Sequence, residues 1–150
     1  MLEYILNKED STQFQKIATF KIKMYLTKLK EMFEKMVIKK DASLIPFYYH
    51  QDFLLYTNEQ VTDYNAFLKS HQEYYKTSIQ YEVEYDEETL LEENEKVAGR
   101  IWITTSRSNE TPKKIEVILI AQFKDNKIYR LWELTYPDWS KLPAFAQQKN

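Results

Sequence analysis

Ile115–Phe123 reads IEVILIAQF and Ile128–Tyr136 reads IYRLWELTY, with the polar tetrapeptide Lys124–Lys127 (KDNK) between them. Two runs rich in β-branched and aromatic residues around a short polar connection predict a long β-hairpin. Since the first run is apolar on both faces at its centre, we expect the sheet to be covered on two sides. One layer of helices covers only one of them.

The connection admits two turns, which place different side chains on each face of the sheet. A two-residue turn at Asp125–Asn126 puts Trp132 on the same face as Leu119. A three-residue loop over Lys124–Asn126 puts Glu133 on that face instead. Because side chains alternate along a strand, this difference of one residue reverses every side chain of the second strand.

Length and composition limit the classes of protein to consider. The 150 residues, 43% of them hydrophobic, fit one domain, 1–150, with a sizeable core. A net charge of -2 argues against nucleic acid or an acidic membrane as a partner, and no apolar run reaches the ~20 residues that span a bilayer. The absence of cysteine excludes thiolate metal sites, and the single glycine, Gly99, excludes Gly-rich phosphate loops. The N-terminus lacks a signal-peptide pattern, so we expect a cytoplasmic protein, without a cofactor or metal.

The rest of the chain shows helical patterns first and strand patterns later. Apolar residues recur at three- and four-residue steps from about Ser11 to Lys39, which predicts a long amphipathic helix. Asp10 and Gln13 have the spacing of a capping box at its start. The further expected elements are a short helix from Asp41 or Ser43 through Tyr49, a strand over Asp52–Thr57, a loop over Asn58–Asp63, a helix capped by Thr62 or Asp63, a strand over Ile79–Tyr85, a solvated acidic turn over Asp86–Glu95 and a strand over Val97–Thr105.

This order predicts an α+β fold, with helices on one face of a mostly antiparallel sheet. Loose motifs accompany it, namely Asp41-x-x-Leu44-Ile45-x-Phe47-Tyr48 before Asp52-Phe53, a helix around Phe67, and Trp132-Glu133 and Asp138 after the hairpin turn. From about Phe14 to Tyr136 the chain resembles the cone-shaped superfamily of nuclear transport factor two, ketosteroid isomerases, scytalone dehydratase and SnoaL-type polyketide cyclases. The resemblance implies a curved sheet wrapped around N-terminal helices, with a core at about 11–136 and a C-terminal tail at 137–150.

The resemblance also implies which catalytic groups the chain lacks. On an alignment of the short helix, the general-base aspartate of the isomerases falls on or beside Thr57, their oxyanion-hole tyrosine on Phe33, and its aspartic-acid partner on Ala121. Abstracting a proton beside a carbonyl needs a base, and stabilising the enolate needs hydrogen-bond donors. Ketosteroid-isomerase chemistry is therefore not expected, and the fold alone leaves enzyme, carrier and interaction module open.

Glu133 is the residue best suited to chemistry, because the resemblance favours the three-residue loop. A carboxylate in a largely apolar cone has a raised pKa and can exchange protons near neutral pH. Arg100 is its expected partner, either orienting a substrate or forming a purely structural salt bridge. The residues expected on the pocket side of the sheet are Val117, Leu119, Ala121, Tyr129, Leu131, Glu133, Thr135, Ala98, Arg100, Trp102 and Thr104.

His71 and a group of apolar side chains are candidates for ligand binding. His71 lies at helical spacing from Phe67, where it either lines the pocket mouth as a proton carrier or ligand donor, or is partly exposed without a role. The expected ligand-binding residues are Phe33, Tyr56, Phe67, His71, Trp102, Leu119, Ala121 and Leu131. A wider aromatic set that includes Tyr49 and Tyr75 forms either a hydrophobic pocket or ordinary core.

The outer face of the sheet is expected to carry an apolar patch too large to leave in water. Its expected members are Ile101, Ile103, Ile118, Ile120, Trp132 and Leu134. Either a second copy covers the patch in a homodimer, or the tail with Trp139, Leu142 and Phe145 folds over it. Two classes of function remain: an enzyme that uses Glu133 for isomerase-, cyclase- or dehydratase-type chemistry on a hydrophobic or carbonyl-bearing molecule, and a noncatalytic dimer that binds a ligand or a protein.

Overall fold

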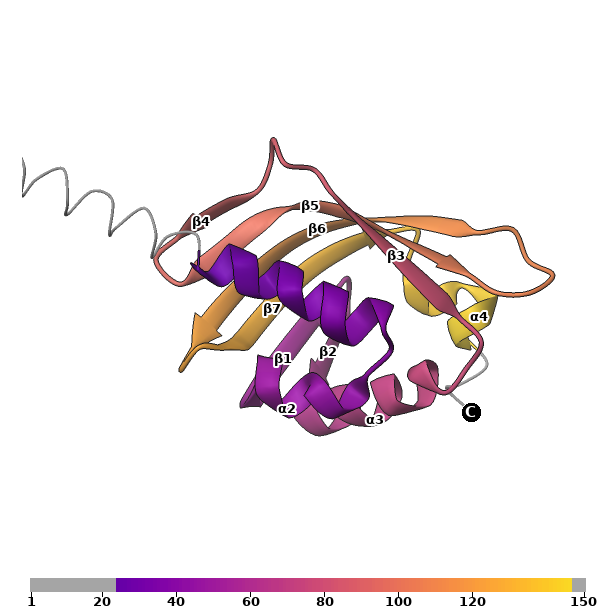
Figure 1. Cartoon of the computed structure of the whole chain (residues 1–150), viewed down its shortest axis with the longest axis horizontal. Coiled ribbons are helices and arrows are strands. Elements are labelled where there is room, and N and C mark those ends of the chain that lie inside the picture. Colours follow the sequence, from indigo (N-terminus) through magenta and orange to yellow (C-terminus); the bar gives the residue numbers. More distant parts are fainter. Residues whose placement is uncertain (1–23, 147–150) are drawn as a thin grey trace, which may run out of the picture.

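The protein is a curved, open β-sheet with helices on its concave side (Figure 1). The computed structural model describes residues 24–146. Within this range seven strands form one sheet in the order β2-β1-β7-β6-β5-β3, with β4 paired to β5. The neighbouring strands are antiparallel except β1 and β7, which are parallel. The predicted α+β class is confirmed.

The elements follow the predicted order. Residues 24–32 are α-helical and continue into the π-helix η1 (Phe33–Ile38), whereas the predicted start of this helix, with Asp10 and Gln13, lies outside the described residues. The other helices are η2 (Ala42–Leu44), α2 (Ile45–Tyr48), α3 (Tyr64–Tyr75), η3 (Trp139–Lys141) and α4 (Pro143–Ala146). The strands are β1 (Tyr49–Thr57), β2 (Gln60–Asp63), β3 (Gln80–Tyr85), β4 (Leu91–Glu93), β5 (Lys96–Ser106), β6 (Lys113–Lys124) and β7 (Lys127–Tyr136).

Local side-chain chemistry sets the helix boundaries. Lys40 takes a left-handed conformation (φ 56°) after η1, and its ammonium group donates to two carbonyls of the α3–β3 connection at 2.6 and 2.9 Å. The Asp41 carboxylate accepts from the Ser43 backbone N–H (3.1 Å), and Asp63 accepts from that of Ala66 (2.9 Å). Each of these two carboxylates satisfies a backbone N–H that the start of a helix leaves unpaired. The predicted caps at Asp41 and Asp63 are confirmed.

Two short strands were missed by the sequence patterns. The segment Asn58–Asp63, predicted as a loop, contains β2, which turns back at Asn58 (φ 52°) and pairs with the end of β1. The acidic segment Asp86–Glu95 contains β4, which pairs with β5. Both strands are mostly exposed, and Val61 of β2 is 63% exposed. A strand without a buried face has no apolar alternation to reveal it.

The terminal hairpin has the shorter of the two predicted turns. Asp125 and Asn126 both adopt left-handed conformations, with φ of 52° and 61°. Phe123 pairs with Ile128, and both side chains are fully buried. Two left-handed central residues match the right-handed twist of the flanking strands, and Asp and Asn tolerate this conformation better than most residues. The predicted three-residue loop is therefore wrong.

A β-bulge in β7 nevertheless brings Glu133 to the Leu119 face. The pairing shifts by one residue, so that Gln122 lies opposite Arg130 and Tyr129 is the extra residue. Beyond the bulge Leu119 pairs with Glu133. The predicted orientation of Glu133 is correct, but its cause is the bulge. The expected inward position of Tyr129 is wrong, because its ring packs on the Arg130 guanidinium at 3.8 Å, outside the pocket.

The side chains of strand β5 lie on the opposite faces of the sheet from those predicted. Gly99 pairs with Leu119, and residues directly opposite each other in an antiparallel pair share a face. Ile101 and Ile103 therefore face the helices, not the outer surface. The residues wrongly expected on the pocket side are Ala98, Arg100, Trp102 and Thr104, which share the outer face with Ile118 and Ile120.

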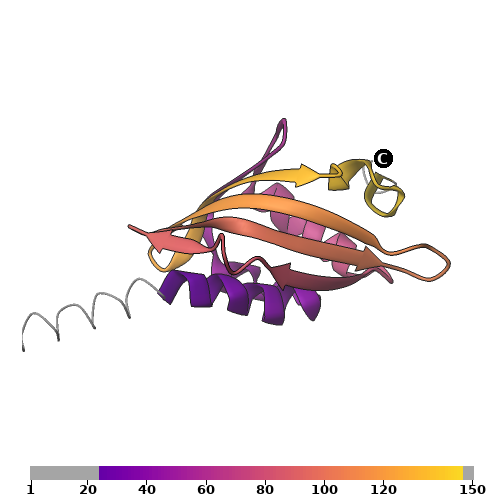
Figure 2. The same cartoon turned by 90° about the horizontal axis from the view of Figure 1, so that it is seen from above.

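The C-terminal tail packs at one end of the cone. Trp139 and Phe145 contact Tyr74 of α3, with ring centroids 5.9 and 5.2 Å apart. Figures 1 and 2 show α4 at the end of the molecule where the β5–β6 connection projects. As far as it is described, the tail does not cover the outer sheet face, so that alternative is wrong. No helix within residues 24–146 is long and apolar enough to cross a membrane, and the predicted cytoplasmic location stays a prediction.

The left-handed conformation of Asn126 predicts a specific sensitivity to β-branched residues at this position. A β-branched residue is strained at positive φ, so Asn126→Val should lower the free energy of unfolding by roughly 1–2 kcal/mol. Urea denaturation measures the change. The matched control is Glu82→Val at an exposed position of β3, where valine suits the strand and the change should stay within about 0.5 kcal/mol. Equal effects at the two positions would contradict the left-handed conformation of Asn126.

Candidate functional site

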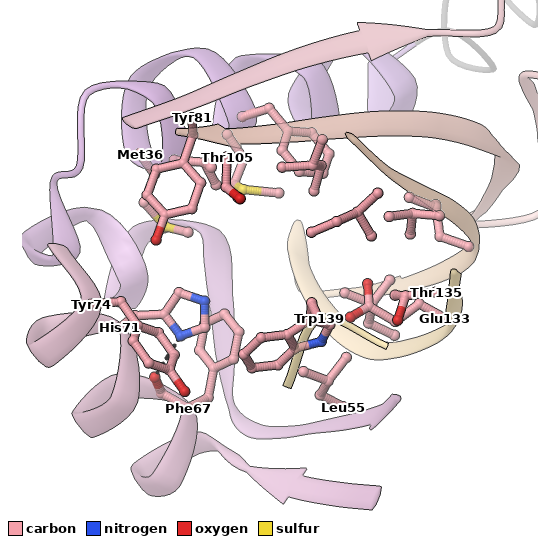
Figure 3. Close-up of a pocket in the computed structure, with 18 of the residues that line it drawn as sticks. Met36, Leu55, Phe67, His71, Tyr74, Tyr81, Thr105, Glu133, Thr135 and Trp139 are labelled. Atoms are coloured by element: carbon pink, nitrogen blue, oxygen red, sulfur yellow. Dashed lines mark hydrogen bonds between the residues drawn. The ribbon is translucent and has the colours of Figure 1, made fainter. Parts of the chain in front are cut away.

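A cavity lies between the concave face of the sheet and the helices, with a volume of about 140 Å³. Its wall is mostly aliphatic and aromatic. Among its polar side chains, Glu133 and Thr135 of β7 lie at one end, and His71, Tyr74 and Tyr81 lie toward the other (Figure 3). An apolar cavity with a few converging polar groups is the usual form of a small-molecule site.

Glu133 is positioned by the parallel pairing of β7 with β1. Thr57 lies directly beside it in that pairing, and the Thr57 hydroxyl donates to Glu133 Oε1 at 3.0 Å. The turn after β1 fixes the same part of β7, because the Asn58 side chain exchanges two hydrogen bonds of 3.0 Å with Thr135. The Asn58 backbone N–H also donates to the Glu133 carbonyl at 3.1 Å. The carboxyl group is therefore attached to a firmly held backbone.

The surroundings of Glu133 favour its neutral form. Burial raises the pKa of Glu133 from 4.5 to about 7, and the hydrogen bond from Thr57 opposes the rise. No lysine or arginine is among the described residues that line the cavity. At neutral pH the group is therefore divided between carboxylic acid and carboxylate, which suits it to both giving and taking a proton.

His71 is held as a neutral imidazole. Its Nδ1 lies 2.9 Å from the Phe67 carbonyl, which accepts only if Nδ1 carries the proton. Burial lowers the pKa of His71 from 6.5 to about 4, and the bond to Phe67 only partly offsets this. The ring lies on that of Phe67, with centroids 3.9 Å apart. His71 therefore presents an unprotonated Nε2, so at neutral pH it can accept a hydrogen bond but has no positive charge.

Two buried tyrosines add hydroxyl groups to the cavity wall. Tyr49 is almost wholly buried, and its hydroxyl donates to the Met32 sulfur at 3.4 Å. The Tyr75 hydroxyl is also buried and has no hydrogen-bond partner among the described residues. Burial raises the pKa of Tyr49, and the nearby Tyr75 and Glu133 raise it further, so both phenols stay protonated at neutral pH.

The structure brings together six of the ten predicted site residues. Those that line the cavity are Glu133, Phe33, Phe67, His71, Leu119 and Leu131. Their roles stay predictions. Ala121 is fully buried but does not line the cavity.

Three predicted site residues lie on the outer face of the sheet, so their expected place in the pocket is wrong. Arg100 donates to Asp86 at 2.7 and 2.9 Å and stacks on Trp102 at 4.9 Å. Tyr56 stacks on Trp132, with ring centroids 5.8 Å apart. Arg100 therefore does not meet Glu133, and the alternative of a Glu133–Arg100 salt bridge is also wrong.

Several lining residues were not predicted for the site. Trp139 and Phe145 come from the tail, which one of the two sequence-based alternatives placed over the other face of the sheet. Thr57 does not line the cavity itself but donates a hydrogen bond to Glu133. The resemblance gave a signal for it, because the catalytic aspartate of the isomerases aligns on or beside this residue. Among residues 24–146 no group of three or more histidine, cysteine or acidic residues is placed to hold a metal ion.

Comparisons with known proteins find the same fold. No protein-family model matches the sequence, and no curated protein matches it. Solved structures do match: an LEH-like epoxide hydrolase from M. tuberculosis has a TM-score of 0.66 at 8% identity, with 85% of this chain and 92% of that chain covered. AclR from Streptomyces galilaeus, provisionally named a hydroxylase, has a TM-score of 0.62 at 19% identity, with coverages of 81% and 88%.

A third match is a protein from Jannaschia sp. CCS1, provisionally named a SnoaL-like polyketide cyclase. Its TM-score is 0.61 at 8% identity, with 77% of this chain and 87% of that chain covered. The predicted resemblance is thereby confirmed at the level of the fold: the chain has the cone-shaped fold of the nuclear transport factor two-like superfamily. One fold of this kind hosts several activities, so function must be argued from the cavity.

The raised pKa of Glu133 predicts a pH-dependent loss of stability. The folded carboxyl binds its proton more tightly than the unfolded one, so stability falls as pH rises from 4.5 through about 7, and the loss persists above that. Glu133→Gln removes the effect. The variant should therefore gain in free energy of unfolding over the wild type across this range, by at most roughly 3 kcal/mol at the plateau. Urea denaturation at a series of pH values measures the difference.

Thr57→Val provides the matched test. It removes the hydrogen bond that lowers the Glu133 pKa, so the pH range over which stability falls should still begin near 4.5 but extend to higher pH than in the wild type. A difference between Glu133→Gln and the wild type that does not change with pH would contradict a desolvated carboxyl group.

Proposed function

We propose that the protein binds a small, largely apolar molecule with a carbonyl group, and that Glu133 moves protons at the carbon beside that carbonyl. The observation that carries the proposal is a carboxyl group with a pKa of about 7 in an apolar cavity. Glu133 is the only acidic side chain among the described lining residues. A general acid or base is most effective when its pKa lies near the working pH.

The chemistry requires only proton transfer. The Glu133 carboxylate takes a proton from the carbon, and the electron pair of that C–H bond forms the C=C bond of an enolate, whose oxygen receives the negative charge. The protonated Glu133 then returns the proton to the same carbon or to another. Isomerisation, cyclisation and dehydration of carbonyl compounds all use this first step, and the name of the Jannaschia protein fits such a substrate class.

The size of the cavity limits the ligand. A volume of about 140 Å³ is below the roughly 300 Å³ or more that drug-sized ligands occupy. It is close to that of an apolar cavity that holds a single benzene ring. The proposal is therefore restricted to one-ring or short-chain compounds, which excludes a whole steroid.

Cyclohexanone is a suitable probe, because its ring carries exchangeable hydrogens beside the carbonyl. In D2O the wild-type protein should accelerate their replacement by deuterium, as measured by NMR. The rate should rise with pH through about 7 and then level off, because the carboxylate is the base. Glu133→Gln should lower the protein-dependent rate by about 100-fold or more, whereas Glu82→Gln on the exposed face of β3 should leave it unchanged.

The experiment also separates the two candidate functions. If Glu133→Gln exchanges the probe as fast as the wild type does, the acid–base role of Glu133 is wrong. If the wild type binds cyclohexanone without accelerating exchange, the cavity is a noncatalytic ligand site. The alternative function, a noncatalytic dimeric module, is favoured by a separate observation: the large exposed apolar surface on the outer face of the sheet has no part in proton transfer.

We also propose that this outer face joins two copies of the chain in a homodimer. Its exposed apolar residues are Ile118, Ile120, Trp132, Leu134 and Tyr136. Charges of both signs flank them: Arg100 lies 3.9 Å from Glu116, and Lys114 lies 2.9 Å from Glu84. These charges are already paired within the chain, so they can stay at the rim while the apolar centre of a second copy, related by a two-fold axis, covers the same centre of the first.

Leu134→Glu tests the dimer. Leu134 is 65% exposed in the single chain, and a carboxylate there becomes an unpaired buried charge if two copies meet. The dissociation constant should rise by about 100-fold or more, as light scattering over a dilution series measures. Gln72→Glu adds the same charge to the exposed surface of α3 and should leave the mass unchanged. A wild-type monomer at all concentrations would contradict the proposal.

A further inference from the structure

The His71 side chain lies in the cavity wall with only one of its two ring nitrogens paired. Nδ1 lies 2.9 Å from the Phe67 carbonyl oxygen and 3.3 Å from the Ser70 hydroxyl oxygen. Both contacts of the ring within residues 24–146 are made by Nδ1, and Nε2 has no hydrogen bond there. In a largely apolar cavity an unpaired nitrogen lowers stability until a ligand supplies its partner.

The Phe67 carbonyl determines that Nε2 is an acceptor. A carbonyl oxygen only accepts hydrogen bonds, so Nδ1 must carry the proton, because otherwise two lone pairs would face each other at 2.9 Å. The Ser70 hydroxyl is compatible with this tautomer, since it donates its own proton to the same carbonyl at 3.0 Å. A neutral imidazole has one N–H, and therefore Nε2 keeps its lone pair.

This lone pair is open to the cavity. Within residues 24–146 the unpaired polar side-chain atoms that are fully buried are the hydroxyl oxygens of Tyr75 and Tyr85, and His71 Nε2 is not one of them. His71 lines the cavity, and Figure 3 shows one ring nitrogen on the side of the hydrogen bond and the other facing the space inside the cavity. A donor on a bound ligand can therefore reach Nε2.

We infer that His71 Nε2 accepts a hydrogen bond from a hydroxyl group of the ligand, and that the preferred ligand carries this hydroxyl on the side remote from its carbonyl group. The inference rests on the proposed function and deepens it by naming a second polar group of the substrate class. Glu133 lies at the opposite end of the cavity from His71 (Figure 3). A carbon atom beside Glu133 and a hydroxyl at His71 thus belong to opposite ends of one small molecule.

The surroundings of His71 favour a neutral donor over a charged one. Its ring lies 3.9 Å from that of Phe67 and meets the rings of Tyr74 and Tyr75 edge to face, at 5.9 and 5.5 Å between centroids. An ammonium group here would lose its water and find an imidazole without negative charge. A hydroxyl brings no charge, and it pairs the nitrogen that a methyl group would leave unpaired.

The binding test compares 4-hydroxycyclohexanone with 4-methylcyclohexanone, in which a methyl group of similar size replaces the hydroxyl opposite the carbonyl. Dissociation constants are measured by NMR titration of the full-length protein. The preference is the constant for the methyl compound divided by that for the hydroxy compound. His71→Phe should lower this preference by about tenfold, because it weakens binding of the hydroxy compound and leaves the methyl compound bound at least as tightly.

A spectroscopic test needs no variant, because His50 is the only other histidine of the chain and serves as an internal control. His50 does not line the cavity, and its Nδ1 already accepts from the Asp52 backbone N–H at 3.0 Å. In 15N NMR of the ring nitrogens, an unprotonated nitrogen that accepts a hydrogen bond moves upfield. The hydroxy compound should move the His71 Nε2 signal in this way, the methyl compound should not, and neither should move the His50 signals.

Four results would overturn the inference: a protonated Nε2 in the unliganded protein, equal movement of its signal by both probes, a preference that His71→Phe leaves unchanged, or failure of both probes to bind the wild type. If His71→Phe does not fold, the 15N signal decides. The proton-transfer function fails separately, when Glu133→Gln leaves deuterium exchange unchanged. A hydroxyl preference that depends on His71 in a protein that does not catalyse exchange would support the subsite and contradict catalysis.

Discussion

The extra residue at Tyr129 is the constraint on which the site depends. Without this bulge the two-residue turn would put Trp132 inside the cone and Glu133 on the outer surface. Contacts around Tyr129 maintain the bulge: the Arg130 guanidinium stacks on its ring and donates to the Asp52 carbonyl at 2.7 Å and the Tyr129 carbonyl at 2.9 Å. A surface arginine thus helps to determine which side chains reach the cavity from β7.

The main features of the fold were predictable because several independent patterns agree with it. The three- and four-residue spacing predicted a helix that ends near Lys39, Asp63 marked the start of α3, and the hairpin runs marked β6 and β7. The inward position of Glu133 was reached for a wrong reason. The longer loop would have shifted the pairing of β6 and β7 by one residue, and the bulge shifts it by the same amount. The wrong turn therefore predicted the correct face for Glu133. A bulge has no residue pattern of its own, and a single sequence cannot reveal it.

The faces of the β5 side chains could not be predicted from the sequence. Ile101 and Trp102 are both apolar, so alternation did not distinguish the two faces. Arg100 was assigned to the cavity as a partner for Glu133, but Asp86 in the connection before β4 already pairs with it on the outer face. The face on which a charged side chain lies depends on which opposite charge is close to it in the folded chain. For this reason Glu133 has no cationic partner among residues 24–146, and its pKa rises where a salt bridge would have lowered it.

The polar groups of the cavity lower the stability of the fold, and this cost supports the proposed function. An apolar core of this size needs neither a protonatable carboxyl group nor a phenol without an acceptor, and aliphatic side chains would pack there without penalty. The resemblance aligns a catalytic aspartate with Thr57, the residue directly beside Glu133 in the β1–β7 pairing. A carboxylate from β7 can therefore occupy the part of the cavity next to β1, where that aspartate would lie. The Thr57 hydroxyl donates a hydrogen bond to this carboxylate. The chain lacks the expected residue at the expected position, yet it retains a carboxyl group in the same neighbourhood of the cone.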